Sequence, residues 1–299
     1  MPRISYSCAM QNQRAHYADR IEKVVQHLSR AIPSGEIPQL AELARIAHLS
    51  DYHFHRIFRL MTGETPIVMV RRLRLAAAAH SMSAASTVTE AAAAAGYSTS
   101  QGFARAFRSG VGNSASGARA GGQLASIKEQ LSRPAKPGDG TPRPPISIEI
   151  VSLEPFTVTA LRNVGDYAEL NLGYARLVSL LADPRAITGL FGIPYDDPEA
   201  TPPAECRFDC CVTLPDAPAG TNELCSLEIA GGRFARLRQV GSYDQCWSNL
   251  DRIYAFIVDE LNEEIGEAPP FIHYFDDPDE KPAELLGADL HVPLPGAPR

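Results

Sequence analysis

Residues 54–59, Phe-His-Arg-Ile-Phe-Arg, and residues 103–108, Phe-Ala-Arg-Ala-Phe-Arg, decide the fold of the first half of this chain. The two stretches share the pattern Phe-x-Arg-x-Phe-Arg at an offset of 49 residues, and Gly63 and Gly112 follow at the same offset. Repetition of several positions at one offset is stronger evidence than a single motif. In each copy the phenylalanines lie four residues apart, so they occupy one helix face and can anchor it in a core. The arginine between them points elsewhere.

The residues around this repeat predict helices. Apolar residues recur at helical spacing in six segments: 14–32, 40–49, 51–61, 66–81, 89–95 and 100–109. Ser50 and Thr99 are suited to cap the third and sixth segments, and Pro66 is suited to begin the long fourth one. A short helix, a turn and a helix that carries the arginine form a helix-turn-helix unit, whose second helix fits the DNA major groove. We therefore expect an all-α domain with two such units.

The same residues resemble the AraC family of regulators. The resemblance rests on residues 40–50 (LAELARIAHLS), 53–58 (HFHRIF), 94–99 (AAGYST) and 103–107 (FARAF), and it covers residues 14–120. The chain departs from the family where Val111, Ala115 and Ala118 stand for the usual Phe, Pro and Tyr. These losses are expected to loosen the packing of the last helix. The resemblance implies a DNA-binding domain over residues 10–122.

Position by position, the resemblance also implies which side chains contact DNA. The residues expected at base edges are Tyr52, His55 and Arg56 in the first unit and Ser100, Gln101 and Arg105 in the second. The residues expected at phosphates are Arg59, Arg71 and Arg108. Arginine can donate two hydrogen bonds to guanine, and glutamine can pair with adenine. The alternative is that these exposed polar side chains only confer solubility. His53 is expected to pack rather than to bind a metal.

The charge is distributed unevenly along the chain. Residues 1–135 hold 16 Lys and Arg against 8 Asp and Glu, a balance of +8, and the remainder holds 12 against 27, a balance of −15. A basic half favours phosphate contacts, although accidental segregation would give the same pattern. Between the halves, residues 132–145 are rich in Pro and Gly and have no apolar face, which predicts a linker.

The second half contains a different repeat. Residues 162–167 (RNVGDY) match residues 238–243 (RQVGSY) at an offset of 76, and residues 195–198 (YDDP) match residues 275–278 (FDDP) at an offset of 80. Asp209-x-x-Val-x-Leu-Pro also recurs 80 residues later, from Asp289. Each copy reads as strand, helix, loop and strand, and the two copies must share one antiparallel sheet to bury enough apolar surface. We expect an α+β domain over residues 146–295, with a ligand groove between its two helices.

This half resembles the GyrI-like effector-binding domain. The resemblance rests on residues 240–243 (VGSY), the helix from Trp247 to Tyr254, and residues 288–294 (ADLHVPL). It implies that an acidic residue on the last strand, here Asp289, attracts cationic lipophilic ligands. Strand alternation sends Asp289 and His291 to the same face, and rings nearby can hold a delocalised cation. The expected ligand-binding residues are Tyr167, Tyr243, Trp247, Tyr254, Phe275, Asp289 and His291. The alternative for each ring is plain core packing.

The remaining features limit the classes of function. Six cysteines form no CxxC pair, which favours reduced thiols over disulfides, although a redox or metal site at Cys206, Cys210 and Cys211 is an alternative. We expect neither metal nor cofactor. No run of about 18 apolar residues predicts a membrane span, and residues 1–30 do not resemble a signal peptide, so we expect a cytoplasmic protein.

Together these patterns predict a transcription regulator rather than an enzyme. Its expected partners are double-stranded DNA, a small-molecule effector and RNA polymerase. One alternative is a GyrI-like hydrolase that uses Asp289, His291 and Tyr243 as acid–base groups. Another is a domain that sequesters a toxic ligand while the DNA-binding half controls only its own synthesis.

Overall fold

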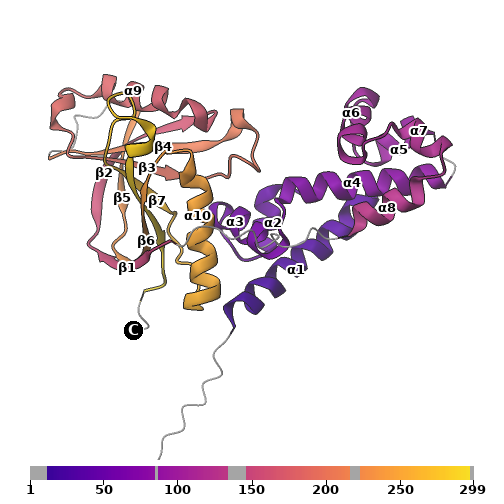
Figure 1. Cartoon of the computed structure of the whole chain (residues 1–299), viewed down its shortest axis with the longest axis horizontal. Helices are drawn as coiled ribbons and strands as arrows, with labels where there is room; N and C mark the ends of the chain where they lie inside the picture. Colours follow the sequence, from indigo (N-terminus) through magenta and orange to yellow (C-terminus); the bar gives the residue numbers. More distant parts are fainter. Residues whose placement is uncertain (1–11, 85–86, 134–145, 216–222, 297–299) are drawn as a thin grey trace, which may run out of the picture.

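The computed structural model describes residues 12–84, 87–133, 146–215 and 223–296. The helices of the first half are α1 (Gln13–Ala31), α2 (Leu40–Ile46), α3 (Asp51–Thr62), α4 (Pro66–Ser83), α5 (Val88–Ala94), α6 (Ser100–Val111), α7 (Ala115–Ala120) and α8 (Leu124–Ser132). Figure 1 shows α4 running between two small helical groups, with α6 at the end far from the sheet. The helix pairs α2–α3 and α5–α6 are the two predicted helix-turn-helix units.

The two units have nearly the same internal geometry. The rings of Phe54 and Phe58 lie 5.5 Å apart at 57°, and those of Phe103 and Phe107 lie 5.5 Å apart at 56°. Each recognition helix ends at a glycine in the left-handed conformation, Gly63 with φ 77° and Gly112 with φ 78°, which a residue with a side chain adopts only at a cost. The fixed offset in the sequence therefore reflects a repeated structure.

An arginine from the preceding helix closes the turn of each unit. Arg74 donates to the carbonyl oxygens of Ala95 at 2.7 Å and Gly96 at 2.6 Å. Arg20 does the same for Ala47, at 2.5 Å, and for His48. These contacts satisfy carbonyls at the end of a helix, which have no partner within it. This pair of arginines was not predicted from the sequence.

The two residues predicted to cap recognition helices differ in their hydrogen bonds. Thr99 accepts a hydrogen bond from the Gly102 amide, so it caps α6 as predicted. Ser50 occupies the corresponding position of α3, but its side chain makes no capping bond. The substitutions that were expected to loosen the second unit do not prevent α7 from forming, and Ala115 and Ala118 are buried in its core.

The second half is built on one eight-stranded antiparallel sheet. Its elements are β1 (Ile148–Leu153), β2 (Phe156–Val164), α9 (Leu170–Leu180), β3 (Gly189–Pro194), β4 (Arg207–Thr213), β5 (Leu224–Ile229), β6 (Gly232–Val240), α10 (Gln245–Phe256), β7 (Phe271–Tyr274) and β8 (Gly287–Pro293). The strand order is β1-β6-β8-β7-β3-β4-β2-β5, so the two copies meet where β3 pairs with β7. The predicted α+β class is confirmed. The segments 189–194 and 271–274 are strands that the predicted order of strand, helix, loop and strand did not include.

The buried residues show how the halves are joined. One core cluster combines residues of α1 to α4, including Phe54 and Phe58, with residues of α10 and of the face of β6, β7 and β8 that α10 covers. A separate cluster fills the second helix-turn-helix unit. The first unit thus shares a core with the C-terminal half, and the second unit has its own. The predicted linker lies almost wholly outside the described residues. No described helix is long and apolar enough to cross a membrane.

Candidate nucleic-acid and effector sites

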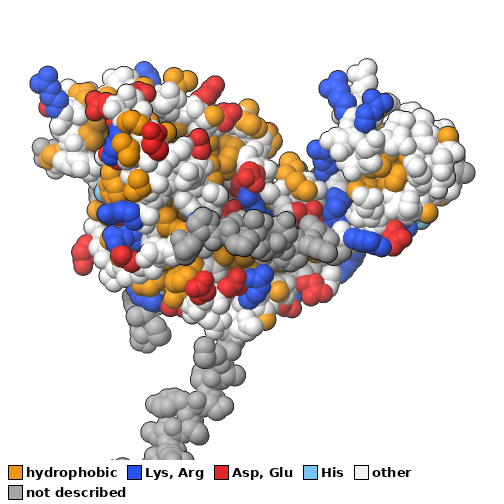
Figure 2. Space-filling model, in the orientation of Figure 1, with side chains coloured by type: hydrophobic (Ala, Val, Ile, Leu, Met, Phe, Trp, Pro, Cys, Tyr) orange, Lys and Arg blue, Asp and Glu red, His pale blue; other side chains and the backbone are white. Residues whose placement is uncertain are grey.

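The second recognition helix, α6, is open to solvent. Ser100, Gln101, Arg105 and Arg108 are all exposed, while Phe103 and Phe107 on the opposite face are fully buried. Arg71 on α4 is exposed as well. Figure 2 shows basic side chains on this lobe of the molecule. The residues that sequence analysis placed at DNA in the second unit are therefore accessible to it.

The first recognition helix, α3, is in the opposite situation because it packs on α10. Arg56, the counterpart of Arg105, is only 5% exposed. Its Nη1 donates to Asp251 Oδ1 at 2.7 Å and to the Trp247 carbonyl oxygen at 3.3 Å. Its guanidinium lies 5.8 Å from the centre of the Tyr254 ring. In this conformation Arg56 contacts protein and is not available to a base.

The neighbours of Arg56 on α3 are held in the same way. Arg59 forms ion pairs with Asp251 at 3.0 Å, with Glu199 at 2.9 Å and with Asp197. The Tyr52 hydroxyl donates to the Glu267 carbonyl oxygen. The residues predicted at bases and phosphates in the first unit thus lie at a contact with the C-terminal half.

Two histidines of α3 are buried at this contact. His53 Nδ1 and the Tyr254 hydroxyl are hydrogen-bonded at 2.5 Å, and His53 Nε2 lies 3.1 Å from the Ala268 carbonyl oxygen. Burial lowers the pKa of His53 to about 3, so the ring is neutral at neutral pH and packs as predicted. His55 is 2% exposed, and neither of its ring nitrogens has a hydrogen-bond partner among the described residues.

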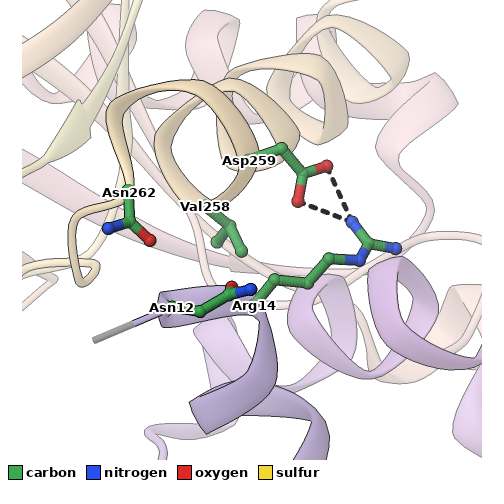
Figure 3. A pocket seen from close by; sticks show the side chains of 5 residues that line it. All are labelled: Asn12, Arg14, Val258, Asp259 and Asn262. Atoms are coloured by element: carbon green, nitrogen blue, oxygen red, sulfur yellow. Dashed lines mark hydrogen bonds and ion pairs between the residues drawn. The ribbon is translucent and has the colours of Figure 1, made fainter. Parts of the chain in front are cut away.

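Helix α1 extends the contact on one side. Arg14 Nη1 donates to both carboxylate oxygens of Asp259, at 2.6 and 2.7 Å. These side chains line an open hollow of about 510 Å³ with Asn12, Val258 and Asn262 (Figure 3). Further along, the Ile265 amide donates to the Tyr17 hydroxyl at 2.9 Å, beside a second hollow of about 380 Å³. Both hollows lie between the helical half and the C-terminal half.

Four of the rings expected at the ligand lie on the helix side of the sheet. The Tyr167 and Trp247 rings are 4.9 Å apart, and the Tyr243 hydroxyl donates to the Asp276 carbonyl oxygen at 2.8 Å. Tyr254 binds His53, as described above. Rings pack in the predicted groove between α9 and α10, where partly buried Tyr174 of α9 lies edge to face with Tyr274 and donates to the Phe191 carbonyl oxygen at 2.8 Å.

The other predicted ligand residues lie on the opposite side of the sheet. Along β8, Ala288, Leu290 and Val292 belong to the core beneath α10, so Asp289 and His291 point away from the helices, as alternation predicted. Phe275 is also on the far side, beside His273 at 4.7 Å. The prediction of a single pocket with both Asp289 and Trp247 is therefore wrong for this conformation, because these residues lie on opposite sides of the sheet.

Asp289 has partners within the chain. It accepts hydrogen bonds from Arg238 Nε and Nη2, both at 2.6 Å, and Arg236 Nη1 lies 3.6 Å away. Burial opposes ionisation, but the hydrogen bonds and charge of Arg238 outweigh it and hold the pKa of Asp289 below its usual value. The Arg238 guanidinium also lies 4.9 Å from the centre of the Phe275 ring. The motif that begins with Arg238 was visible in the sequence, but its pairing with Asp289 was missed.

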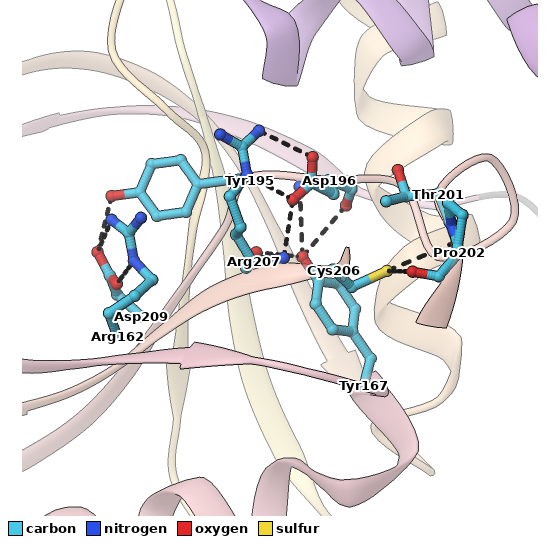
Figure 4. A network of polar contacts seen from close by, with 9 residues as sticks. All are labelled: Arg162, Tyr167, Tyr195, Asp196, Thr201, Pro202, Cys206, Arg207 and Asp209. Carbon is cyan, nitrogen blue, oxygen red and sulfur yellow. Dashed lines mark hydrogen bonds and ion pairs between the residues drawn. The ribbon is translucent and has the colours of Figure 1, made fainter. Parts of the chain in front are cut away.

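The first copy of the repeat has the same arrangement. Arg162 donates to both carboxylate oxygens of Asp209 and lies 4.5 Å from the centre of the Tyr195 ring (Figure 4). The far side of the sheet therefore carries two matched sets of arginine, aspartate and ring. Between them, His291 stacks on Phe271 at 4.3 Å, and burial lowers the pKa of His291 to about 4.

The loop that follows Tyr195 is held by hydrogen bonds between Asp196 and Arg207, also drawn in Figure 4. Arg207 donates to Asp196 through its backbone amide at 2.7 Å and through its guanidinium at 2.9 Å. The Tyr167 hydroxyl donates to the Arg207 carbonyl oxygen at 2.5 Å. Asp197, which follows Asp196 in this loop, forms the ion pair with Arg59. In the same network Cys206 is a free, buried thiol whose pKa burial raises to about 11.

Comparison with known proteins supports the predicted domain type in each half of the chain. Residues 43–121 match the family described as Helix-turn-helix domain, and residues 147–295 match the family described as GyrI-like small molecule binding domain. A curated relative, the probable transcriptional regulator YgiV of Escherichia coli K12, is 30% identical over 105 residues, which are 35% of this chain. The chain spans 66% of the length of that relative.

Two solved structures are also similar. One is EcmrR in its DNA complex within EcmrR-RPo, with 12% identity and a TM-score of 0.42 over 50% of this chain and 58% of that one. The other is the EcmrR C-terminal domain, with 11% identity and a TM-score of 0.40 over 51% of this chain and 99% of that one. On the evidence of the two family matches, residues 43–121 form an AraC-type helix-turn-helix domain and residues 147–295 form a GyrI-like small molecule binding domain.

Proposed function

We propose that this protein is a transcription regulator that binds double-stranded DNA and responds to a small-molecule effector. The observation that carries the proposal is the exposed helix α6, with Ser100, Gln101 and Arg105 on its open face, in a chain that also holds a GyrI-like domain. Such a regulator acts in the cytoplasm, and RNA polymerase is its further partner.

The roles of the basic residues follow from their placement. Arg105 donates to a guanine and Gln101 pairs with an adenine when α6 enters the major groove. Arg71 and Arg108, exposed on α4 and α6, bind phosphates and fix the register of the protein on the duplex. In the first unit, Tyr52, His55, Arg56 and Arg59 take the corresponding roles only after α3 has left α10.

DNA fragments selected from a genomic library by the full-length protein test this proposal. On a selected fragment, Arg105→Ala should weaken binding by about 1–3 kcal/mol and relax the base preference at one position. Arg176→Ala is the matched control, since it removes an exposed arginine from α9 in the C-terminal half. The proposal fails if the wild-type protein enriches no fragment and binds no duplex at low salt.

The effector in this proposal is a lipophilic cation that binds on the far side of the sheet. The Arg238 side chain is 58% exposed while that of Asp289 is 5% exposed, so the arginine can swing into solvent and leave the carboxylate to another cation. Phe275, 43% exposed, then offers its ring face to the same ligand. The effector thus replaces Arg238 rather than entering an empty acidic pocket.

Titration with a panel of lipophilic cations distinguishes this mode of binding from others. Asp289→Asn should weaken binding of the cations, whereas Arg238→Ala should strengthen it because the competing guanidinium is gone. Arg162→Ala makes the same change in the first copy of the repeat and serves as the comparison. If wild type and Asp289→Asn each bind neutral compounds as tightly as cationic ones, recognition of the effector through charge is excluded. Such a result would still allow the domain to bind an effector in another way.

Catalysis is not part of this proposal. The three acid–base groups considered for a hydrolase do not converge, because Tyr243 bonds Asp276 on the helix side of the sheet while Asp289 and His291 lie on the far side. A sequestering role would leave DNA binding indifferent to the ligand. An effector that changes the affinity for DNA therefore separates regulation from sequestration.

A further inference from the structure

The arginines of α3 are bound by acidic side chains of the C-terminal half. We define the acidic clamp as Asp197, Glu199 and Asp251, which contribute three carboxylates from two separate parts of the C-terminal half. Together they bind Arg56 and Arg59. Carboxylates paired with arginines in this way resemble the phosphates that the same side chains would meet on DNA.

The clamp has features of a built binding surface rather than of a chance contact. Asp197 is 3% exposed, and its charge is matched by Arg59 from the other half of the chain. In this conformation the charge of Arg59 offsets the cost of burying that carboxylate. The loop that carries Asp197 is fixed from below by the bonds between Asp196 and Arg207.

The contact and the DNA groove compete for the same side chains. A recognition helix in the major groove must bring its side chains to base edges and phosphates. The Arg56 side chain is 4% exposed and that of Arg59 is 23% exposed, and both are bound to Asp251. The equivalent helix α6 has the same pattern of phenylalanine and arginine and remains exposed. The clamp thus binds arginines of α3, while the equivalent arginines of α6 remain exposed.

We infer that the C-terminal domain inhibits the first helix-turn-helix unit within the same chain, with the acidic clamp occupying α3 in place of DNA. In the closed form only α6 can enter a groove, and release of α3 adds the second reading helix. This inference rests on the proposed function, because it presumes that α6 and α3 bind DNA.

The test compares full-length variants on a duplex of random sequence at several salt concentrations. Asp251→Asn removes the carboxylate shared by Arg56 and Arg59, so it should raise the affinity by roughly tenfold or more. The salt dependence should also steepen, by about 0.9 in the logarithmic slope for each phosphate contact that α3 adds. Glu223→Gln removes one negative charge from an exposed ion pair of the same domain and controls for net charge.

A second pair of variants changes only exposed side chains, which usually perturb folding little. The Glu199 side chain is 72% exposed and faces Arg59, so Glu199→Lys should repel α3 and raise the affinity, whereas Glu223→Lys should give only the smaller effect of net charge. Adding Arg56→Ala to Asp251→Asn should reduce the gain, because the released α3 then lacks one of its DNA contacts.

The outcomes separate the inference from the function on which it rests. If Asp251→Asn and Glu199→Lys match their controls while Arg105→Ala still weakens binding, the protein binds DNA but the clamp does not inhibit it. A gain that Arg56→Ala leaves unchanged would likewise overturn the inference, since α3 would not be the element released. If neither wild type nor any variant binds the duplex, the proposed function itself is wrong.

Discussion

The two equivalent arginines offer a test of the closed form that needs no DNA. Arg56 and Arg105 occupy the same position of the two repeats, but one is buried against α10 and the other is exposed. Replacing Arg56 by alanine removes its hydrogen bonds to Asp251 and to the Trp247 carbonyl oxygen. Breaking a buried ion pair costs about 3–5 kcal/mol. Arg59 still contacts Asp251 at 3.0 Å, so we expect about 3 kcal/mol, near the lower end of that range.

The assay is urea unfolding of the full-length variants, followed through the fluorescence of Trp247, the single tryptophan. Arg56→Ala should lower the midpoint clearly, whereas Arg105→Ala should change the free energy of unfolding by less than about 0.5 kcal/mol, as is usual for an exposed side chain. Arg59→Ala, which breaks the clamp from its other side, should also lower the midpoint. Equal midpoints for Arg56→Ala and Arg105→Ala would refute the closed contact in solution.

Three further predictions concern separate parts of the structure. Burial lowers the pKa of His53 from 6.5 to about 3, so neutral His53 contributes its full stability above pH 6.5 and this stability is lost as the pH falls toward 3. Between pH 6.5 and pH 5 the free energy of unfolding of wild type should fall by about 2 kcal/mol more than that of His53→Gln. Equal losses for the two proteins would contradict this prediction. Phe107→Ala should destabilise the second unit by about 3–5 kcal/mol, measured by amide hydrogen exchange, and leave the fluorescence of Trp247 unchanged because the cores are separate. Asp259→Asn breaks a half-exposed ion pair with Arg14 and should cost less than about 1 kcal/mol in thermal unfolding, and a larger loss would show that this edge holds the contact.

The helical half was predictable because its signals are local and repeated. Pro66 begins α4 as expected, since proline needs no helical partner for its nitrogen at the first position. The segment 189–194, Gly-Leu-Phe-Gly-Ile-Pro, was missed as β3 because it lies in the middle of the sheet. Its last four residues are buried, so no alternation of polar and apolar residues marks it.

The contact between the halves was not predictable from either repeat. Arg56 and Asp251 are separated by 195 positions, and neither residue is unusual on the surface of a helix. The division of the ligand-site residues has a similar origin. Alternation correctly placed Asp289 and His291 together, but it gives no information about which face of the sheet α10 covers. The rings of Trp247 and Tyr254 were therefore assigned to the same pocket as a carboxylate on the other side.

Helix α4 sets the distance at which the two units can act. It contains 18 residues, with its proline at the first position and no glycine to favour a kink, so it spans about 27 Å. A turn of the duplex is about 34 Å long, which places successive major grooves on one side within reach of two helices joined by a helix of this length. An operator for the open protein must therefore hold its two half-sites in phase. Inserting about half a turn of DNA between them would carry one half-site to the opposite side of the duplex and leave a single helix bound.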